Sequence, residues 1–168
     1  MCGDEYMDME AQNHSSHPEA LRLWLRLLTC TQLVEKQVRN HLREQFDTTL
    51  PRFDLMAQLQ RNPDGLKMNE LSRRMMVTGG NVTGITDQLV TEGLVERLEV
   101  DGDRRAYCVR LTSQGRKTFD DMAKQHEEWI VSAFGVLTAK EVDALYKLLG
   151  KVKEHHHSKS VDKTFEMI

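Results

Sequence analysis

The chain has 168 residues, of which 39% are hydrophobic and 29% charged, a length and balance typical of one globular domain. No run approaches the roughly 18 apolar residues of a membrane span, the acidic start is unlike a targeting peptide, and three scattered cysteines suit a reducing compartment. We therefore expect a cytoplasmic protein without a membrane partner. The net charge is −3, but residues 1–20 hold five acidic and no basic residues, so the remainder carries +2 and is compatible with DNA binding.

The first 45 residues predict an arm and a long helix. Residues 1–17 are polar and acidic, as in a flexible arm. From Pro18 to about Gln45, apolar residues recur at steps of three and four, which indicates an amphipathic helix. Additional apolar residues near its start give more apolar surface than one small core can cover, so we expect a second copy of the chain to bury part of it.

The next segment predicts three shorter helices. The second begins near Pro51, and the third covers about 69–76. Thr78 is a good N-cap for a fourth helix at 79–92, which Gly93 ends. Its expected inward stripe is Val82, Ile85 and Leu89.

The pattern then changes to strands and returns to helices. Residues 94–100 and 105–111 predict two strands around an Asp-Gly turn. Thr112 caps a fifth helix, and Thr138 with Glu141 forms a capping box for a sixth.

This order predicts a mainly α fold with a small β-hairpin, a winged helix-turn-helix with N- and C-terminal dimerisation helices. The whole domain would span 18–154, with the DNA-binding lobe at about 50–112. The dimerisation helices would cover about 18–45 and 113–154, and 155–168 would form a C-terminal tail.

The fourth helix carries the residues expected to touch DNA. Its N-terminal turns would enter the major groove, where Asn and Gln suit adenine and Thr suits a thymine methyl or a phosphate. The predicted contacts are Thr78, Gly80, Asn81, Thr83, Gly84 and Gln88. The glycines, Gly79 included, weaken a helix, which close backbone approach to DNA would explain. Helix–helix contact and a mobile first turn are the alternatives.

The hairpin turn supplies a second expected contact. Asp103 and Arg105 are two residues apart on a strand, so they share a side and the carboxylate can orient the guanidinium toward a minor groove. Arg104 points the other way and can reach a phosphate. A solvated turn with a surface ion pair is the alternative.

Three motifs resemble the MarR family of bacterial regulators: Leu66-x-x-x-Glu70-Leu71-Ser72, the run from Leu89 through Glu92-Gly93-Leu94-Val95-Glu96-Arg97, and Asp103-Arg104-Arg105 followed by Leu111-Thr112-x-x-Gly115. The resemblance covers about 18–154. It implies homodimers that bind pseudo-palindromic double-stranded DNA and are released by small anionic ligands or by oxidation. Lys67 stands where the family usually has Thr, and the glycines of the fourth helix stand where it usually has Arg or Ser.

The segment Met76-Val77-Thr78-Gly79-Gly80-Asn81-Val82-Thr83-Gly84 is similar to the branch that controls hydroxycinnamate and related aromatic-acid breakdown. The resemblance implies an effector that is an aromatic acid or its coenzyme A thioester. Candidate effector contacts on the first helix are Arg22, Trp24, Arg26, Arg39 and Arg43. A solvated basic face with a core tryptophan is the alternative.

The remaining signals favour regulation over catalysis. Cys30 lies in the apolar stripe without a basic neighbour, so a buried structural cysteine is favoured over a redox switch. Three consecutive histidines at 155–157 cannot converge on one metal from an ordered element. No nucleophile elbow, P-loop or convergent catalytic set is present, so we expect no enzyme, cofactor or metal site. The alternative function is a winged-helix protein-interaction module without a specific DNA site.

Overall fold

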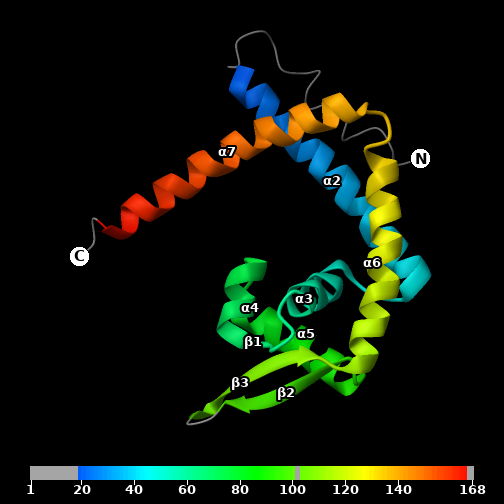
Figure 1. The fold of residues 1–168 in the computed structure, drawn as a ribbon, viewed down its shortest axis with the longest axis vertical. Helices are drawn as coiled ribbons and strands as arrows, with labels where there is room; N and C mark the ends of the chain where they lie inside the picture. Colours follow the sequence, from blue (N-terminus) through cyan, green and yellow to red (C-terminus); the bar gives the residue numbers. More distant parts are fainter. Residues whose placement is uncertain (1–18, 101–102, 166–168) are drawn as a thin grey trace. The chain divides into compact units, whose positions relative to one another are not determined.

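The computed structural model describes residues 19–100 and 103–165, with the backbone alone for 99–100, 103–106 and 157–165. The described chain has six helices and three strands (Figure 1): α2 (Glu19–Phe46), α3 (Leu50–Gln60), β1 (Leu66–Lys67), α4 (Met68–Met75), α5 (Gly79–Thr91), β2 (Val95–Val100), β3 (Asp103–Leu111), α6 (Ser113–Ala133) and α7 (Ala139–Phe165). The predicted fold class is confirmed. The chain divides into two compact units at Glu127/Glu128, within α6. Among the described residues, no helix combines the length and hydropathy that crossing a membrane requires.

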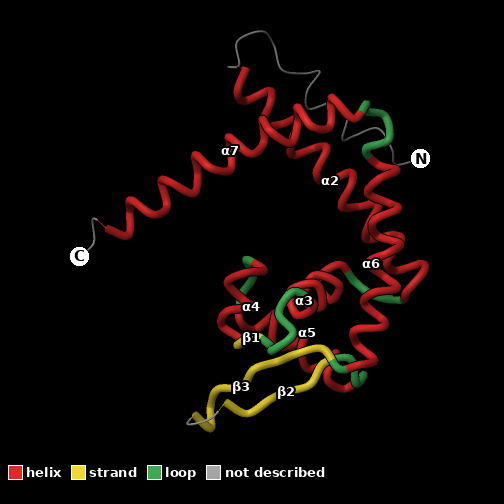
Figure 2. The backbone as a smooth tube through the Cα atoms, in the orientation of Figure 1, coloured by secondary structure: helices red, strands yellow, loops and turns green. Residues whose placement is uncertain are grey.

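The sheet is antiparallel, with strand order β1-β3-β2 (Figure 2). The long hairpin pairs Val95 with Leu111 and Leu98 with Cys108, and its register shifts between Glu99 and Val100. β1 joins the other edge of β3, where Leu66 lies opposite Val109. The sequence analysis missed β1 because two residues are too short to produce an alternating pattern.

The core of the first unit lies where α3, α4 and α5 meet the sheet (Figure 1). Its fully buried aliphatic side chains come from all of these elements: Leu55, Leu59, Leu71, Val82, Leu89 and Val109. Phe53 of α3 stacks on Phe119 of α6 at 5.3 Å and contacts His126 at 4.9 Å between ring centroids. Burial against this cluster lowers the pKa of His126.

The predicted helix ends are largely confirmed. Gly93 adopts φ +71°, and the amide of Leu94 donates to the Leu89 carbonyl at 2.9 Å, so a Schellman motif closes α5. At the start of α7, the amide and the hydroxyl of Thr138 both donate to the Glu141 carboxylate, at 2.8 and 2.7 Å. These two bonds lower the pKa of the Glu141 carboxyl.

In α2 only Val38 and Leu42 are buried, so this helix carries more apolar surface than the core covers, as expected. Three other expectations were wrong in detail. The sixth helix continues past Glu154 to Phe165, so the backbone does not become a tail at residue 155. Cys30 is exposed rather than buried. In α5, Thr86 takes the fully buried place expected for Ile85, because 100° per residue brings it onto the same face as Val82 and Leu89.

A tight junction joins the end of α5 to the start of α6. The Thr112 amide donates to the Leu94 carbonyl at 3.1 Å, and the Thr112 hydroxyl donates to the Gly93 carbonyl at 2.7 Å. The same hydroxyl oxygen accepts the Gly115 amide at 3.0 Å and so caps α6, as predicted. A Cβ at Gly115 would lie 1.9 Å from the Leu94 oxygen, so only glycine fits there.

Gly115→Ala should therefore lower the free energy of unfolding by roughly 3 kcal/mol, because a methyl group cannot enter without opening the junction. Urea unfolding would measure the loss. Gly84→Ala is the matched control, since a Cβ there meets nothing within 4 Å. Equal midpoints for Gly115→Ala and the unsubstituted protein would contradict the proposed constraint.

Candidate nucleic-acid interface

Helix α5 has one buried and one exposed face. Val82, Thr86 and Leu89 are fully buried against the rest of the first unit. The helix residues predicted to contact DNA all lie on the exposed part of α5 or at its N-cap: Thr78, Gly80, Asn81, Thr83, Gly84 and Gln88. The structure thus brings the predicted helix contacts together on one accessible surface.

The hydrogen bonds of this surface limit what each side chain can do. Thr78 is the N-cap residue in extended conformation, but its side chain makes no capping bond. The Thr83 hydroxyl donates to the Gly79 carbonyl at 2.9 Å, so its proton is used inside the helix. The hydroxyl oxygen of Thr83 can still accept a bond, and its methyl group can make an apolar contact.

The glycines of α5 are not required by packing within the described chain. A Cβ built at Gly79, Gly80 or Gly84 meets no atom within 4 Å. Helix–helix contact within the described chain, one of the alternatives from the sequence, is therefore wrong. Alanine would fit at all three positions and would favour the helix. Close approach by another molecule and a loose first turn are the explanations that remain.

An ion pair ties α5 to the hairpin. Arg97 on β2 pairs with Asp87 on α5, and its guanidinium carbon lies 4.9 Å from the centroid of the Tyr107 ring on β3. The contact joins the exposed helix to the strands. Sequence reasoning did not find this group, because its members are far apart in the chain and match no motif.

The predicted wing residues fall at the start of β3. Asp103, Arg104 and Arg105 belong to this strand by their backbone, but their side chains lie outside the described part of the structure. Nearer the helices, Arg110 on β3 pairs with Glu96 on β2 at 2.7 Å. The role of the wing residues stays a prediction.

The predicted effector residues lie along α2 and are all exposed: Arg22, Trp24, Arg26, Arg39 and Arg43. Arg39 pairs with Glu35 one helical turn away, as on a solvated face. None of the five lines the cavity described next.

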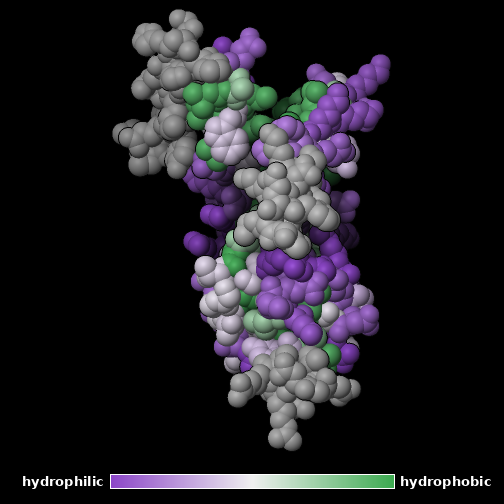
Figure 3. Space-filling model, turned by 90° about the vertical axis from the view of Figure 1, so that its left-hand side faces the viewer, coloured by the Kyte–Doolittle hydropathy of each residue, from purple (hydrophilic) through white to green (hydrophobic). Residues whose placement is uncertain are grey.

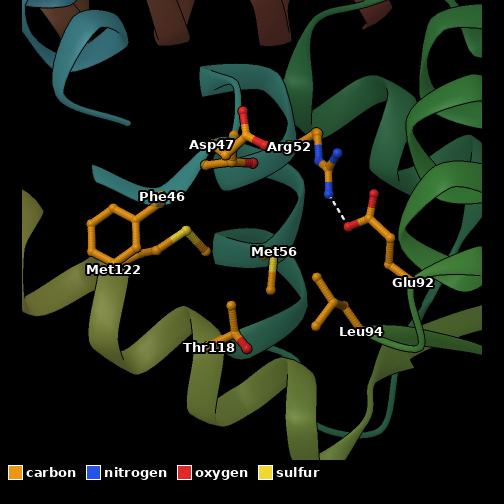
Figure 4. Close-up of a pocket in the computed structure, with 9 residues that line it drawn as sticks. Phe46, Asp47, Arg52, Met56, Glu92, Leu94, Thr118 and Met122 are labelled. Carbon is orange, nitrogen blue, oxygen red and sulfur yellow. Dashed lines mark hydrogen bonds and ion pairs between the residues drawn. The ribbon is translucent and has the colours of Figure 1, made fainter. Parts of the chain in front are cut away.

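A cavity of about 350 Å³ lies in the first unit at the C-terminal end of α5 (Figure 4). Its walls are both apolar and charged: Phe46, Asp47, Thr48, Arg52, Met56, Glu92, Leu94, Thr118 and Met122. Arg52 pairs across it with Glu92, the C-cap residue of α5 (Figure 4). The Arg52 Nε is buried and makes no hydrogen bond. No sequence signal marked Arg52, since a single arginine after a helix-starting proline is unremarkable.

Helices α4 and α5 form a helix-turn-helix in which α5 has an exposed face, and a β-hairpin adjoins it. This arrangement defines a winged helix-turn-helix DNA-binding protein. Comparison with known proteins identifies the family of the chain. Residues 46–106 match the model of the MarR family. An uncharacterized HTH-type transcriptional regulator of Bacillus anthracis is 30% identical over 142 residues, covering 84% of this chain and 93% of the relative. The chain belongs to the MarR family and is a transcriptional regulator, not an enzyme.

Two solved structures are similar over most of the chain. A mutant of Escherichia coli MarR in complex with operator DNA is 27% identical, with a TM-score of 0.69 over 80% of this chain and 95% of that one. AbsC, a MarR family regulator from Streptomyces coelicolor, is 21% identical and shares the fold, with a TM-score of 0.73 over 87% of this chain and 99% of AbsC.

Proposed function

We propose that the protein is a homodimeric repressor that binds a pseudo-palindromic operator and is released by a small aromatic acid or its coenzyme A thioester. The observation that carries the DNA-binding mode is the exposed face of α5, on which polar and glycine residues gather without an intrachain packing reason. The E. coli MarR mutant that has a similar fold is bound to operator DNA, which supports the same mode here.

The DNA contacts follow from the chemistry of each side chain. The amides of Asn81 and Gln88 suit adenine, which offers one acceptor and one donor in the major groove. Thr83 presents its methyl group to a thymine. In the wing, Asp103 orients Arg105 toward the minor groove, whose narrow A·T segments attract arginine.

Gly84→Ala tests the close approach of α5 to DNA. The substitution should stabilise the folded protein by roughly 1 kcal/mol through helix propensity, yet weaken operator binding at least tenfold because the methyl group holds the helix away from the bases. Urea unfolding and fluorescence anisotropy with an operator duplex measure the two effects. Thr91→Ala, in the last turn of the same helix, is the control and should leave DNA affinity unchanged. Undiminished affinity of Gly84→Ala would exclude close approach at this position.

Exposed apolar side chains support the homodimer. On α2 they include Leu23, Trp24 and Leu28, and on α7 they include Val142, Leu145, Leu149 and Val152. Figure 3 shows hydrophobic side chains reaching the surface beside predominantly hydrophilic regions. Exposed apolar faces of this kind are typical of surfaces that another chain covers, and a second copy of the chain would cover them in the homodimer.

We expect a dimer at micromolar concentration in analytical ultracentrifugation. Leu149→Asp should shift the protein toward monomer, because the interface would have to bury a charge. Lys147→Gln, an exposed position on the same helix, should leave the dimer intact. A monomeric unsubstituted protein that still binds its operator would overturn the homodimer proposal.

The cavity beside Arg52 is a better-supported effector site than the exposed arginines of α2. It is large enough for an aromatic acid, and its apolar walls suit a ring. A ligand carboxylate can compete with Glu92 for the Arg52 guanidinium. Because Glu92 is the C-cap residue of α5, its displacement would break the ion pair that joins the end of the recognition helix to Arg52 of α3. The similarity of residues 76–84 to the hydroxycinnamate branch supports the choice of an aromatic acid.

Calorimetry with aromatic acids and their coenzyme A thioesters tests the effector. Operator DNA should weaken binding of the true effector at least about tenfold, equivalent to roughly 1.4 kcal/mol of coupling, and the effector should weaken DNA binding equally. Arg52→Gln should abolish effector binding, whereas Arg39→Gln on α2 should not. The reverse pattern would move the site to α2, and equal affinity for free and DNA-bound protein would rule out a compound as the effector.

A further inference from the structure

Met76 ends helix α4 in an unusual conformation. Its backbone is left-handed, with φ 55° and ψ 36°. Its amide donates to the Arg73 carbonyl and the Val77 amide donates to the Ser72 carbonyl, at 3.3 and 3.2 Å, which is a Schellman motif. Glycine normally takes this position, because a Cβ makes the left-handed conformation unfavourable.

The other left-handed positions of the described chain follow the rule. Gly93 closes α5 with the same pair of hydrogen bonds, and Gly65 has φ +96°. Asp47, with φ 48°, is of a residue type that tolerates this conformation. Met76 alone among them combines a long apolar side chain with left-handed backbone.

The fold gains little from this methionine. Its side chain is 92% exposed, so it contributes almost nothing to the core. A glycine would relieve the backbone, and a polar residue would be better solvated. The residue therefore carries two costs that no described contact within the chain offsets.

Met76 is also placed next to the DNA-binding helix. It lies in the turn between α4 and α5, two residues before the N-cap Thr78. The Ser72 hydroxyl donates to the Val77 carbonyl at 2.6 Å and holds this turn in place. The methionine is thus an exposed apolar group on a held backbone beside the N-terminal turn of α5.

We propose that Met76 contacts the C5-methyl group of a thymine in the major groove and so helps to determine the operator sequence. The inference rests on the proposed DNA binding by α5. A thymine methyl is the apolar feature of the major groove, and an unbranched thioether adapts its shape to such a group. Burying both groups together would offset the cost of exposing the side chain in the free protein.

The test replaces single thymines by uracil, which lacks only the C5-methyl group, in a duplex that the protein selects from a random-sequence pool. At the contacted thymine, uracil should weaken binding of the unsubstituted protein about fourfold for each methyl removed. Met76→Gly should bind the original duplex with the same loss and should be insensitive to uracil at that position. Met76→Leu, which remains apolar, should keep sensitivity to the methyl group.

Two controls separate this effect from a folding defect. Met76→Gly should unfold at an equal or higher urea concentration, since glycine relieves the backbone. Val136→Gly removes a similarly exposed apolar side chain from the turn between α6 and α7 and should leave the uracil response unchanged. If the protein selects a sequence but Met76→Gly shows the same uracil response, the thymine contact is wrong while DNA binding stands. If no sequence is selected, the proposed function fails together with this inference.

Discussion

The close approach of Gly115 to the backbone of Leu94 is the constraint on which the DNA-binding unit depends. It brings the end of α5, the start of β2, the end of β3 and the start of α6 to one point. Thr112 completes the contact by bonding both Gly93 and Leu94 and by capping α6. With the helix and both strands attached there, and with Asp87 and Arg97 joining them further along, α5 has little freedom to tilt against the hairpin.

Because these contacts hold α5 in place, the helix can tolerate its glycines. A helix held only by its own hydrogen bonds would fray with Gly79, Gly80 and Gly84 in its first turns. Here Val82, Thr86 and Leu89 anchor the buried face, and the Schellman motif at Gly93 fixes the C-terminal end. Tertiary contacts therefore supply the helix stability that the glycines on the exposed face reduce. The residues of that face can then suit a ligand rather than the fold.

In the proposed function, an effector bound in the cavity at Arg52 acts on the same helix. Glu92 belongs to the C-cap of α5, and it is also the ionic partner of Arg52 across the cavity. A ligand that binds Arg52 more tightly when Glu92 is displaced has different affinities for the states with and without this ion pair. That difference is the thermodynamic requirement for coupling a ligand to DNA binding.

The sequence by itself determined most of the architecture, because helix caps, apolar periodicity and the Asp-Gly turn are local signals. Thr112, Gly93 and the Thr138–Glu141 box all act within a few residues of their partners, so their roles could be predicted. The exposure of the predicted contact residues on α5 followed from the same periodicity. Thr86 showed that the pattern alone does not decide which flank is buried.

The tertiary structure decided the features that join distant residues. The ion pairs Arg52–Glu92 and Asp87–Arg97 could not be predicted from composition or residue spacing. Each pair joins two elements that come together only when the chain packs. The left-handed conformation of Met76 could not be predicted either, because methionine is not a residue type that indicates a left-handed backbone. Local signals specify where elements begin and end, whereas a cavity or a long-range ion pair exists only once those elements are packed together.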